Sequence, residues 1–188
     1  EKIVLAFDEM QAGFYRTGKK FGFQHYDVNP DLICIGKGMG AGLPLSGIIG
    51  KNEIMDLALE GELSSTHSCN PISCAAGNTV IEVMQSSEFK SNLKSNVNLF
   101  NFRGKALIEK FSFLRKKSNF IGMVGALVFD FKENKKGVEM ANRFCDEALK
   151  SGVLVIKTGR EAVKLSPSLL IKEVSVNKVF DIFEKILN

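Results

Sequence analysis

The sequence predicts an α/β protein, and two observations lead to this prediction. First, three short and almost wholly apolar runs end abruptly at charged or glycine residues, which is typical of strands buried on both faces in a parallel sheet covered by helices. These runs are KIVLAF at 2–7, DLICIG at 31–36 and LSGIIG at 45–50. Second, stretches with the periodicity of amphipathic helices follow the strands along the chain. Strands followed by helices favour a layered fold.

The remaining elements of the first half are expected in a simple order. The stretch between the first two strands is polar and rich in glycine, so we predict a loop there. Helical periodicity appears from about Asn52 to Glu60 and returns after the pair Asn70–Pro71. It continues, with more charged residues, across 91–117.

The pattern changes from about residue 120, where strands and helices alternate over short distances. We predict strands over 121–131, 153–157 and 162–171, and helices over 137–152 and 174–187. We therefore predict two domains, residues 1–88 and residues 89–188. The second is a small C-terminal α+β domain.

Composition excludes several classes of function. The 188 residues are 45% hydrophobic and 24% charged with a net charge of +4, as in ordinary globular proteins. The basic residues form no stripe, so we predict no nucleic-acid partner. No apolar run approaches the roughly 20 residues of a membrane span, and no signal peptide is visible. The four cysteines show no metal-ligand spacing, and we predict reduced thiols in the cytoplasm, no metal site and no membrane association.

Two of the predicted strands end at opposite charges, Asp8 and Lys37. Ligands of open α/β sheets bind at the carboxyl ends of the strands, so these residues are candidates for a site. The simpler interpretation is an ion pair or two solvated turn residues. The glycines around Lys37 do not match a phosphate loop, because Gly38 follows the lysine where that motif needs serine or threonine.

A covalent role for the lysine agrees better with this pattern. A lysine amine condenses with an aldehyde only when it is deprotonated, and flanking glycines leave room for a flat ring. If that ring is a pyridine, it needs an acidic partner at the ring nitrogen, and Asp8 is suitably placed for this.

Several motifs resemble those of the class III (ω-amino acid) aminotransferases, pyridoxal-phosphate enzymes of fold type I. They are Asp-Glu-x-Gln at 8–11, Gly-x-x-Arg-Thr-Gly at 13–18, Lys-Gly-x-Gly-x-Gly-x-Pro-Leu at 37–45, SSTHSCNPISCAA at 64–76 and the C-terminal stretch 162–187. The resemblance implies the second half of a large, mostly parallel-sheet domain, over 1–88, and the whole small domain, over 89–188.

The resemblance also implies roles for individual residues. Lys37 is expected to form the Schiff base with pyridoxal 5'-phosphate, and Asp8 to pair with the ring nitrogen. Gln11 is expected to reach the phenolic oxygen, and Met10 to pack on one face of the ring. Thr66 is expected to donate its hydroxyl to the cofactor phosphate of the other subunit, which implies a homodimer with a shared active site.

The substrate is less well defined by the resemblance. Lys164 falls where many members of the family have an arginine that binds the substrate carboxylate, and lysine lacks the bidentate fork of arginine. We predict transfer of an amino group from a small ω-amino or diamino acid donor to a 2-oxo acid. The alternatives are a racemase or epimerase on the same fold, or a non-catalytic fragment, since members of the family are more than twice as long. If the chain is such a fragment, its expected partner is the missing N-terminal half of the same protein.

Overall fold

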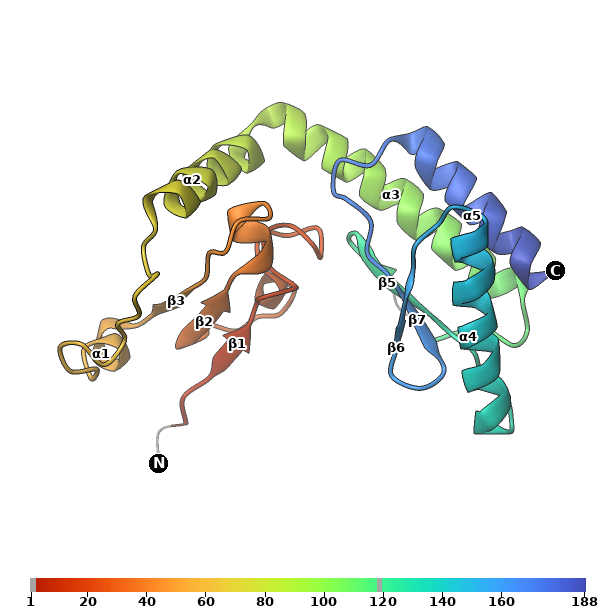
Figure 1. Cartoon of the computed structure of the whole chain (residues 1–188), viewed down its shortest axis with the longest axis horizontal. Coiled ribbons are helices and arrows are strands. Elements are labelled where there is room, and N and C mark those ends of the chain that lie inside the picture. Colours follow the sequence, from red (N-terminus) through yellow and green to blue (C-terminus); the bar gives the residue numbers. More distant parts are fainter. Residues whose placement is uncertain (1–2, 118–119) are drawn as a thin grey trace. The chain divides into compact units, whose positions relative to one another are not determined.

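The chain divides into two compact units, residues 1–90 and 91–188, which we describe separately (Figure 1). The computed structural model describes residues 3–117 and 120–188. The division falls inside helix α3 (Ser87–Lys110). Within the described residues, no helix is long and apolar enough to cross a membrane.

The first unit contains a three-stranded sheet in the order β1 (Ala6–Asp8), β2 (Leu32–Ile35) and β3 (Gly47–Gly50). Strands β1 and β2 are parallel, whereas β3 is antiparallel to β2. The predicted α/β class is confirmed, but the sheet is mixed rather than parallel in this part. The reason is the connection over 36–46, which contains only the short 3-10 helix η2 (Lys37–Gly40) and is too short for a parallel crossover.

Helix α2 (Pro71–Gln85) packs on η2 and on the carboxyl end of β2. Phe14, Ile35 and Val80 form the buried cluster between sheet, loop and helix, with partly buried apolar side chains around them. Asn70 caps the helix, because its Oδ1 accepts hydrogen bonds from the N–H groups of Ile72 and Ser73. Helix α2 begins, as expected, immediately after the Asn70–Pro71 pair.

The expectation that the first and third strands are buried on both faces is wrong for this chain. Val4 and Leu5 before β1 are 54% and 40% exposed, and Ile48 and Ile49 in β3 are 51% and 49% exposed. Helix α2 contacts η2 and the carboxyl end of β2, and β1 and β3 are both edges of the sheet. These apolar residues therefore lack the cover that their sequence pattern indicates.

Asp31 ties the amino ends of β1 and β2 to the end of β3. Its Oδ2 accepts a hydrogen bond of 2.8 Å from the Leu5 N–H, and its Oδ1 pairs with Lys51 Nζ at 2.6 Å. Its carbonyl also accepts the Lys51 N–H. We call this arrangement the Asp31 clasp. It stabilises the edge of the sheet opposite the carboxyl ends of β1 and β2.

The first unit also contains a short helix α1 (Asn52–Met55) and the 3-10 helix η1 (Gly22–His25). The second unit has an antiparallel sheet in the order β4 (Phe120–Ile121), β5 (Val124–Val128), β7 (Ala162–Leu165), β6 (Ile156–Thr158). Its other helices are α4 (Asn134–Lys150) and α5 (Glu173–Leu187).

Buried phenylalanines join the helices of the second unit to its sheet. Phe144 of α4 contacts both Phe129 and Phe183, with ring centroids 5.7 and 5.1 Å apart. Phe180 of α5 contacts Phe100 of α3 at 5.8 Å. These rings bring the helices onto one face of the sheet, the face that Val163 and Leu165 of β7 share.

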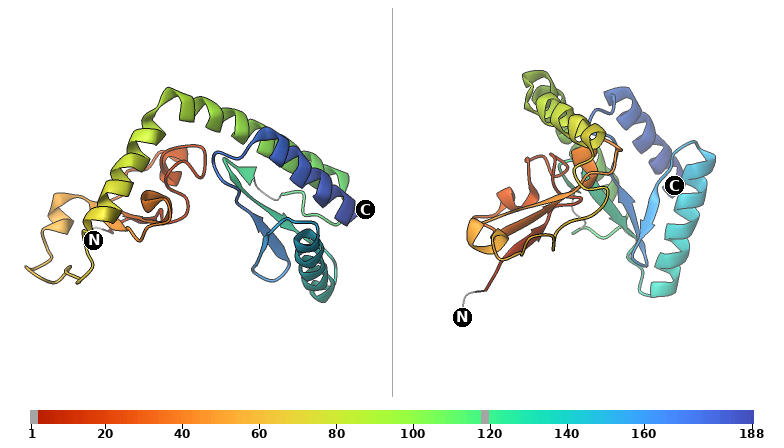
Figure 2. Two further views of the ribbon diagram at one scale, coloured as in Figure 1. Left: turned by 45° about the horizontal axis from the view of Figure 1, so that its top comes forward. Right: turned by 60° about the vertical axis from the view of Figure 1, so that its left-hand side comes forward.

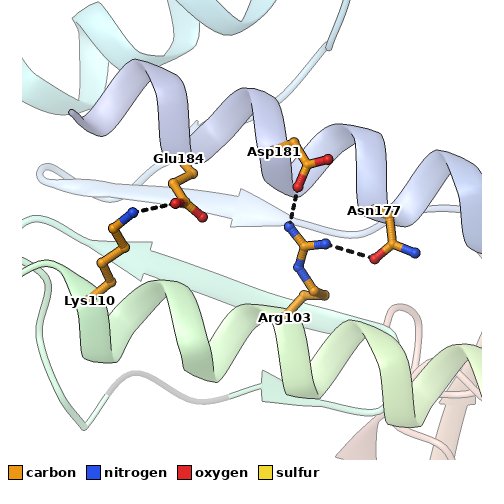
Figure 3. A network of polar contacts seen from close by, with 5 residues as sticks. All are labelled: Arg103, Lys110, Asn177, Asp181 and Glu184. Atoms are coloured by element: carbon orange, nitrogen blue, oxygen red, sulfur yellow. Dashed lines mark hydrogen bonds and ion pairs between the residues drawn. The ribbon is translucent and has the colours of Figure 1, made fainter.

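A polar network also joins α3 to α5, which lie side by side in both views of Figure 2. Arg103 donates hydrogen bonds of 2.7 and 2.6 Å to Asn177 and Asp181, as Figure 3 shows. Lys110 pairs with Glu184 two turns further along. The guanidinium of Arg103 also lies 5.7 Å from the centre of the Phe180 ring.

Candidate active site

Asp8 and Lys37 lie at the same edge of the sheet in the first unit. Because β1 and β2 are parallel, their carboxyl ends point the same way, and Asp8 is opposite Cys34 in the register. Lys37 begins η2, two residues after the end of β2. The structure thus brings together the two charged residues whose placement the sequence predicts, at the edge where α/β proteins bind ligands.

Asp8 has an exposed carboxylate whose orientation is held by the backbone. Its Oδ1 accepts a hydrogen bond of 2.9 Å from the Met10 N–H. The Glu9 N–H donates to the Cys34 carbonyl at 2.9 Å, so the pairing of β1 with β2 continues past Asp8. The carboxylate is consequently fixed relative to the strand that precedes Lys37.

Lys37 is exposed and has an unusual backbone conformation. Its φ angle is +40°, in the left-handed region that costs a residue with a Cβ about 1–2 kcal/mol. Helix α2 holds the segment after it, since a Cβ on Gly77 would lie 2.6 Å from Leu45 Cδ2. Strain of this kind is concentrated at functional sites, where the surrounding structure maintains it.

Met10 packs against the residue that precedes the lysine. A Cβ on Gly36 would lie 2.5 Å from Met10 Cε and 2.8 Å from its sulfur, and one on Gly38 would lie 3.2 Å from Phe14 Cβ. The expectation that these glycines leave open space for a ring is therefore wrong. Their missing side chains make room for Met10 and Phe14, so the Met10 thioether lies next to Gly36, the residue before Lys37.

Gln11 and Thr66 lie on exposed turns. Gln11 follows Met10 in the turn after β1. Thr66 is the second residue of a turn that is closed by the Ser68 N–H to the Ser65 carbonyl and by a 2.6 Å hydrogen bond between the two serine hydroxyls. This turn leads through Cys69, with a φ angle of +54°, to the cap of α2. Thr66 is therefore held on a defined turn, which lies between β3 and α2 along the chain.

Lys164 belongs to the second unit. In β7 its register partners are Ala126 and Ile156, on the sheet face opposite buried Val163 and Leu165. It also contributes to the wall of a largely apolar cavity of about 250 Å³, together with the serines at 166 and 168 and residues of α5. Lys164 is half-buried as a whole residue, and its positive charge makes it a candidate for binding an anionic group.

Glu9 is a buried residue of the site that belongs to the Asp-Glu-x-Gln motif but has no role predicted from the sequence. It is only 1% exposed, and its carboxylate accepts hydrogen bonds of 2.8 and 2.7 Å from the N–H groups of Gly22 and Phe23. These partners are separated from Glu9 by a loop, so no spacing in the sequence indicates the contact. The signal in the sequence that could have pointed to Glu9 is its place between Asp8 and Met10 in the Asp-Glu-x-Gln motif.

The Arg-Thr pair of the loop motif is also partly buried. Burial lowers the pKa of Arg16 from its usual value. Thr17 has a buried hydroxyl that lacks a hydrogen-bond partner among the described residues, although its carbonyl contacts His25 Nε2 at 3.0 Å.

The residues at this edge fit pyridoxal phosphate. An exposed lysine amine is suited to an aldehyde, and a carboxylate on the neighbouring strand is suited to a protonated pyridine nitrogen. The Met10 thioether beside Gly36 supplies an apolar surface at the same place.

Comparison with known proteins identifies the family. The class-III aminotransferase family model matches residues 1–187. This chain belongs to the class-III aminotransferases. This match confirms the resemblance that the motifs indicate. The family is one of enzymes named for the transfer of amino groups.

Curated relatives and solved structures support the same assignment. The chain is 30% identical over 181 residues to the acetylornithine/succinyldiaminopimelate aminotransferase of Buchnera aphidicola, covering 93% of this chain and 41% of that protein. It is also 30% identical over 186 residues to the alanine/serine racemase of Pyrococcus horikoshii. This match covers 97% of this chain and 39% of that protein.

The acetylornithine aminotransferase of Elizabethkingia anophelis superposes with a TM-score of 0.84 at 29% identity, over 98% of this chain and 45% of that one. The chain thus has the fold of the family and spans less than half the length of the proteins it matches.

Proposed function

We propose that the protein containing this chain is a pyridoxal-phosphate-dependent aminotransferase. The single observation that supports this proposal best is the placement of Asp8 and Lys37 at the carboxyl ends of two neighbouring parallel strands. Pyridoxal phosphate, when bound, supplies an electron sink that withdraws electrons from the bond broken at the substrate carbon.

Each residue of the chain has a proposed task. Lys37 Nζ would hold the cofactor through its aldehyde carbon and, once displaced by the substrate amine, would carry the proton from the substrate carbon to the C4′ carbon of the cofactor. Asp8 keeps the pyridine nitrogen protonated, and its orientation by the Met10 N–H supports this role. Met10 packs on the ring and Gln11 contacts the phenolic oxygen.

We assign the remaining contacts to a larger assembly. Thr66 donates its hydroxyl to the phosphate of a second copy, so that a homodimer shares its active sites. Residues of the longer protein outside these 188 supply the other phosphate ligands and cover the exposed apolar residues of β3. The exposed turn of Thr66 and the uncovered sheet support this arrangement. Residues 1–88 then form half of the large domain, and residues 89–188 the small one.

The donor is a small ω-amino or diamino acid, and the acceptor is a 2-oxo acid. The names of the relatives, among them acetylornithine aminotransferases, support this substrate class. Lys164 binds a carboxylate of the substrate as a point charge rather than through a bidentate fork.

The central test uses the full-length protein reconstituted with pyridoxal phosphate. The visible absorbance band of lysine-bound cofactor is expected in the wild type and absent in Lys37→Ala. Lys51→Ala is the matched control, because Lys51 belongs to the Asp31 clasp at the opposite edge of the sheet. If Lys37→Ala keeps both the band and the activity, the proposal is wrong.

Two alternatives have separate tests. The similarity to an alanine/serine racemase favours racemisation as a second candidate, and inversion of a substrate without consumption of a 2-oxo acid would establish it. A non-catalytic role for the chain by itself is tested by equilibrium dialysis of the 188 residues against pyridoxal phosphate. Tight stoichiometric binding contradicts that role.

A further inference from the structure

We propose that Glu9 is a positioning residue that holds Asp8 in the orientation required at the active site. The inference rests on the proposed function, because it assigns Glu9 a task only if Asp8 meets the cofactor. It begins from an unusual feature of the chain, a carboxylate that is 1% exposed in a loop region. Burying a charge is costly unless it is fully hydrogen-bonded, so this position needs a reason.

The carboxylate of Glu9 connects two segments of the loop. Its two oxygens accept the Gly22 and Phe23 N–H groups at 2.8 and 2.7 Å, which are the short distances of charge-assisted bonds. Gly22 leaves little space at this point, since a Cβ there would lie 3.2 Å from each carboxylate oxygen and 3.0 Å from Ala12 Cβ. The contact is therefore closely packed from both sides.

The segment that receives Glu9 is itself fixed by aromatic contacts. The Phe23 ring meets Phe7 of β1 edge to face at 5.8 Å and stacks on Phe21 at 5.9 Å. Phe21 in turn contacts Phe14 of the buried cluster. Glu9 is thus anchored to a segment that packs on the strand carrying Asp8.

The backbone of Glu9 is also fully engaged. Its N–H donates to the Cys34 carbonyl, and its carbonyl accepts the Gly13 N–H at 3.0 Å. With side chain and backbone both held, the adjoining peptide units have little freedom. One of these units carries the Met10 N–H that orients Asp8 Oδ1. The path from Glu9 to Asp8 is therefore one peptide unit and one hydrogen bond.

Glu9→Gln in the full-length protein is the principal test. The amide keeps the size of the side chain but offers one acceptor for two N–H donors. We expect the dissociation constant for pyridoxal phosphate to rise about tenfold, as for the loss of a hydrogen bond to a charged group. In an Asp8→Asn background the same change is expected to raise the constant less than about twofold, because the two residues act as a unit.

A second readout needs no cofactor. Amide hydrogen exchange in the cofactor-free protein is expected to accelerate at Met10 as well as at Gly22 and Phe23 in Glu9→Gln. Asp31→Asn is the control, because it opens the clasp at the other edge of the sheet and leaves the Met10 amide protected. Faster exchange at Gly22 and Phe23 with unchanged exchange at Met10 would show a purely structural role and overturn the proposal. Additive effects of Glu9→Gln and Asp8→Asn on the dissociation constant would do the same.

The outcomes also separate this inference from the proposed function. A wild-type protein that binds no pyridoxal phosphate contradicts the proposed function, while the exchange measurement still decides whether Glu9 holds Asp8. Should Glu9→Gln not fold, Gly22→Ala disturbs the same contact from the opposite side, and the same exchange pattern is expected.

Discussion

Thr17 has a buried hydroxyl without a hydrogen-bond partner among the described residues. An unsatisfied buried polar group costs about 1–3 kcal/mol, so Thr17→Val, which replaces the hydroxyl by a methyl group of similar size, is expected to raise the free energy of unfolding by about 1 kcal/mol. Urea denaturation measures the change. Thr79→Val is the control, because the Thr79 hydroxyl donates to the Ala75 carbonyl at an exposed site on α2. A destabilised Thr17→Val variant would show that the hydroxyl has a partner in solution.

The Asp31 clasp predicts a dependence of stability on pH. The Leu5 N–H, and then Lys51, lower the pKa of Asp31, and Asp31 raises the pKa of Lys51. The lowered pKa means that the stabilisation is complete above the usual aspartate pKa and is lost as the pH falls through the folded-state value. The raised pKa of Lys51 means that its stabilisation is complete below the usual lysine pKa and is lost as the pH rises through the folded-state value.

The measurement for the clasp compares Asp31→Asn with the wild type by urea denaturation across pH. The variant is expected to be less stable at pH 7, and the difference is expected to shrink as the pH falls below the usual aspartate range. A difference that does not change with pH would assign the effect to side-chain shape rather than charge.

At the scale of single elements, α3 and α5 depend on a polar contact as well as on buried phenylalanines. Arg103→Met keeps an unbranched apolar side chain but removes both hydrogen bonds to Asn177 and Asp181. We expect a loss of about 1–2 kcal/mol in the free energy of unfolding, since Asp181 is 60% exposed and water screens its charge. Lys105→Met, on an exposed position of α3, is the control and is expected to change little. Equal effects of the two substitutions would contradict the role of the network.

Much of the secondary structure was predictable from the sequence, and the failures have physical reasons. Asn70 and Pro71 marked the start of α2 because capping is a local interaction. The helix predicted over 52–60 ends at Met55, where Leu57 and Leu59 remain exposed and no packed face supports further turns. The antiparallel direction of β3 relative to β2 could not be predicted from the apolar pattern, because strand direction depends on the length of the connection.

The candidate site was predictable in part for a similar reason. Asp8 and Lys37 stood out because charges at the ends of apolar runs are visible in a linear sequence. The contact of Glu9 with Gly22 and Phe23 and the packing of Met10 on Gly36 were not, because each joins residues across a loop. The roles of Gln11, Thr66 and Lys164 stay predictions.

At the scale of the whole chain, the first unit leaves apolar residues of its sheet exposed to solvent. β3 is an edge strand with two half-exposed isoleucines, and such an edge pairs readily with other chains. We expect the isolated 188 residues to self-associate in sedimentation-velocity experiments, and Ile48→Lys to reduce this association. Leu149→Lys, at a position of α4 that is 60% exposed, is the control and is expected to leave it unchanged. If both substitutions act equally, net charge rather than the edge strand governs the association.

The left-handed backbone of Lys37 has a consequence for mutational scanning of the protein. Glycine adopts a φ angle of +40° without the penalty that a Cβ brings, so Lys37→Gly is expected to raise the abundance of the folded protein in cells above that of Lys37→Ala. A scan that scores growth on transaminase activity is expected to reject both substitutions equally. Position 37 would then rank among the most tolerant sites in one screen and the least tolerant in the other, and this divergence would distinguish a residue retained for chemistry from one retained for folding.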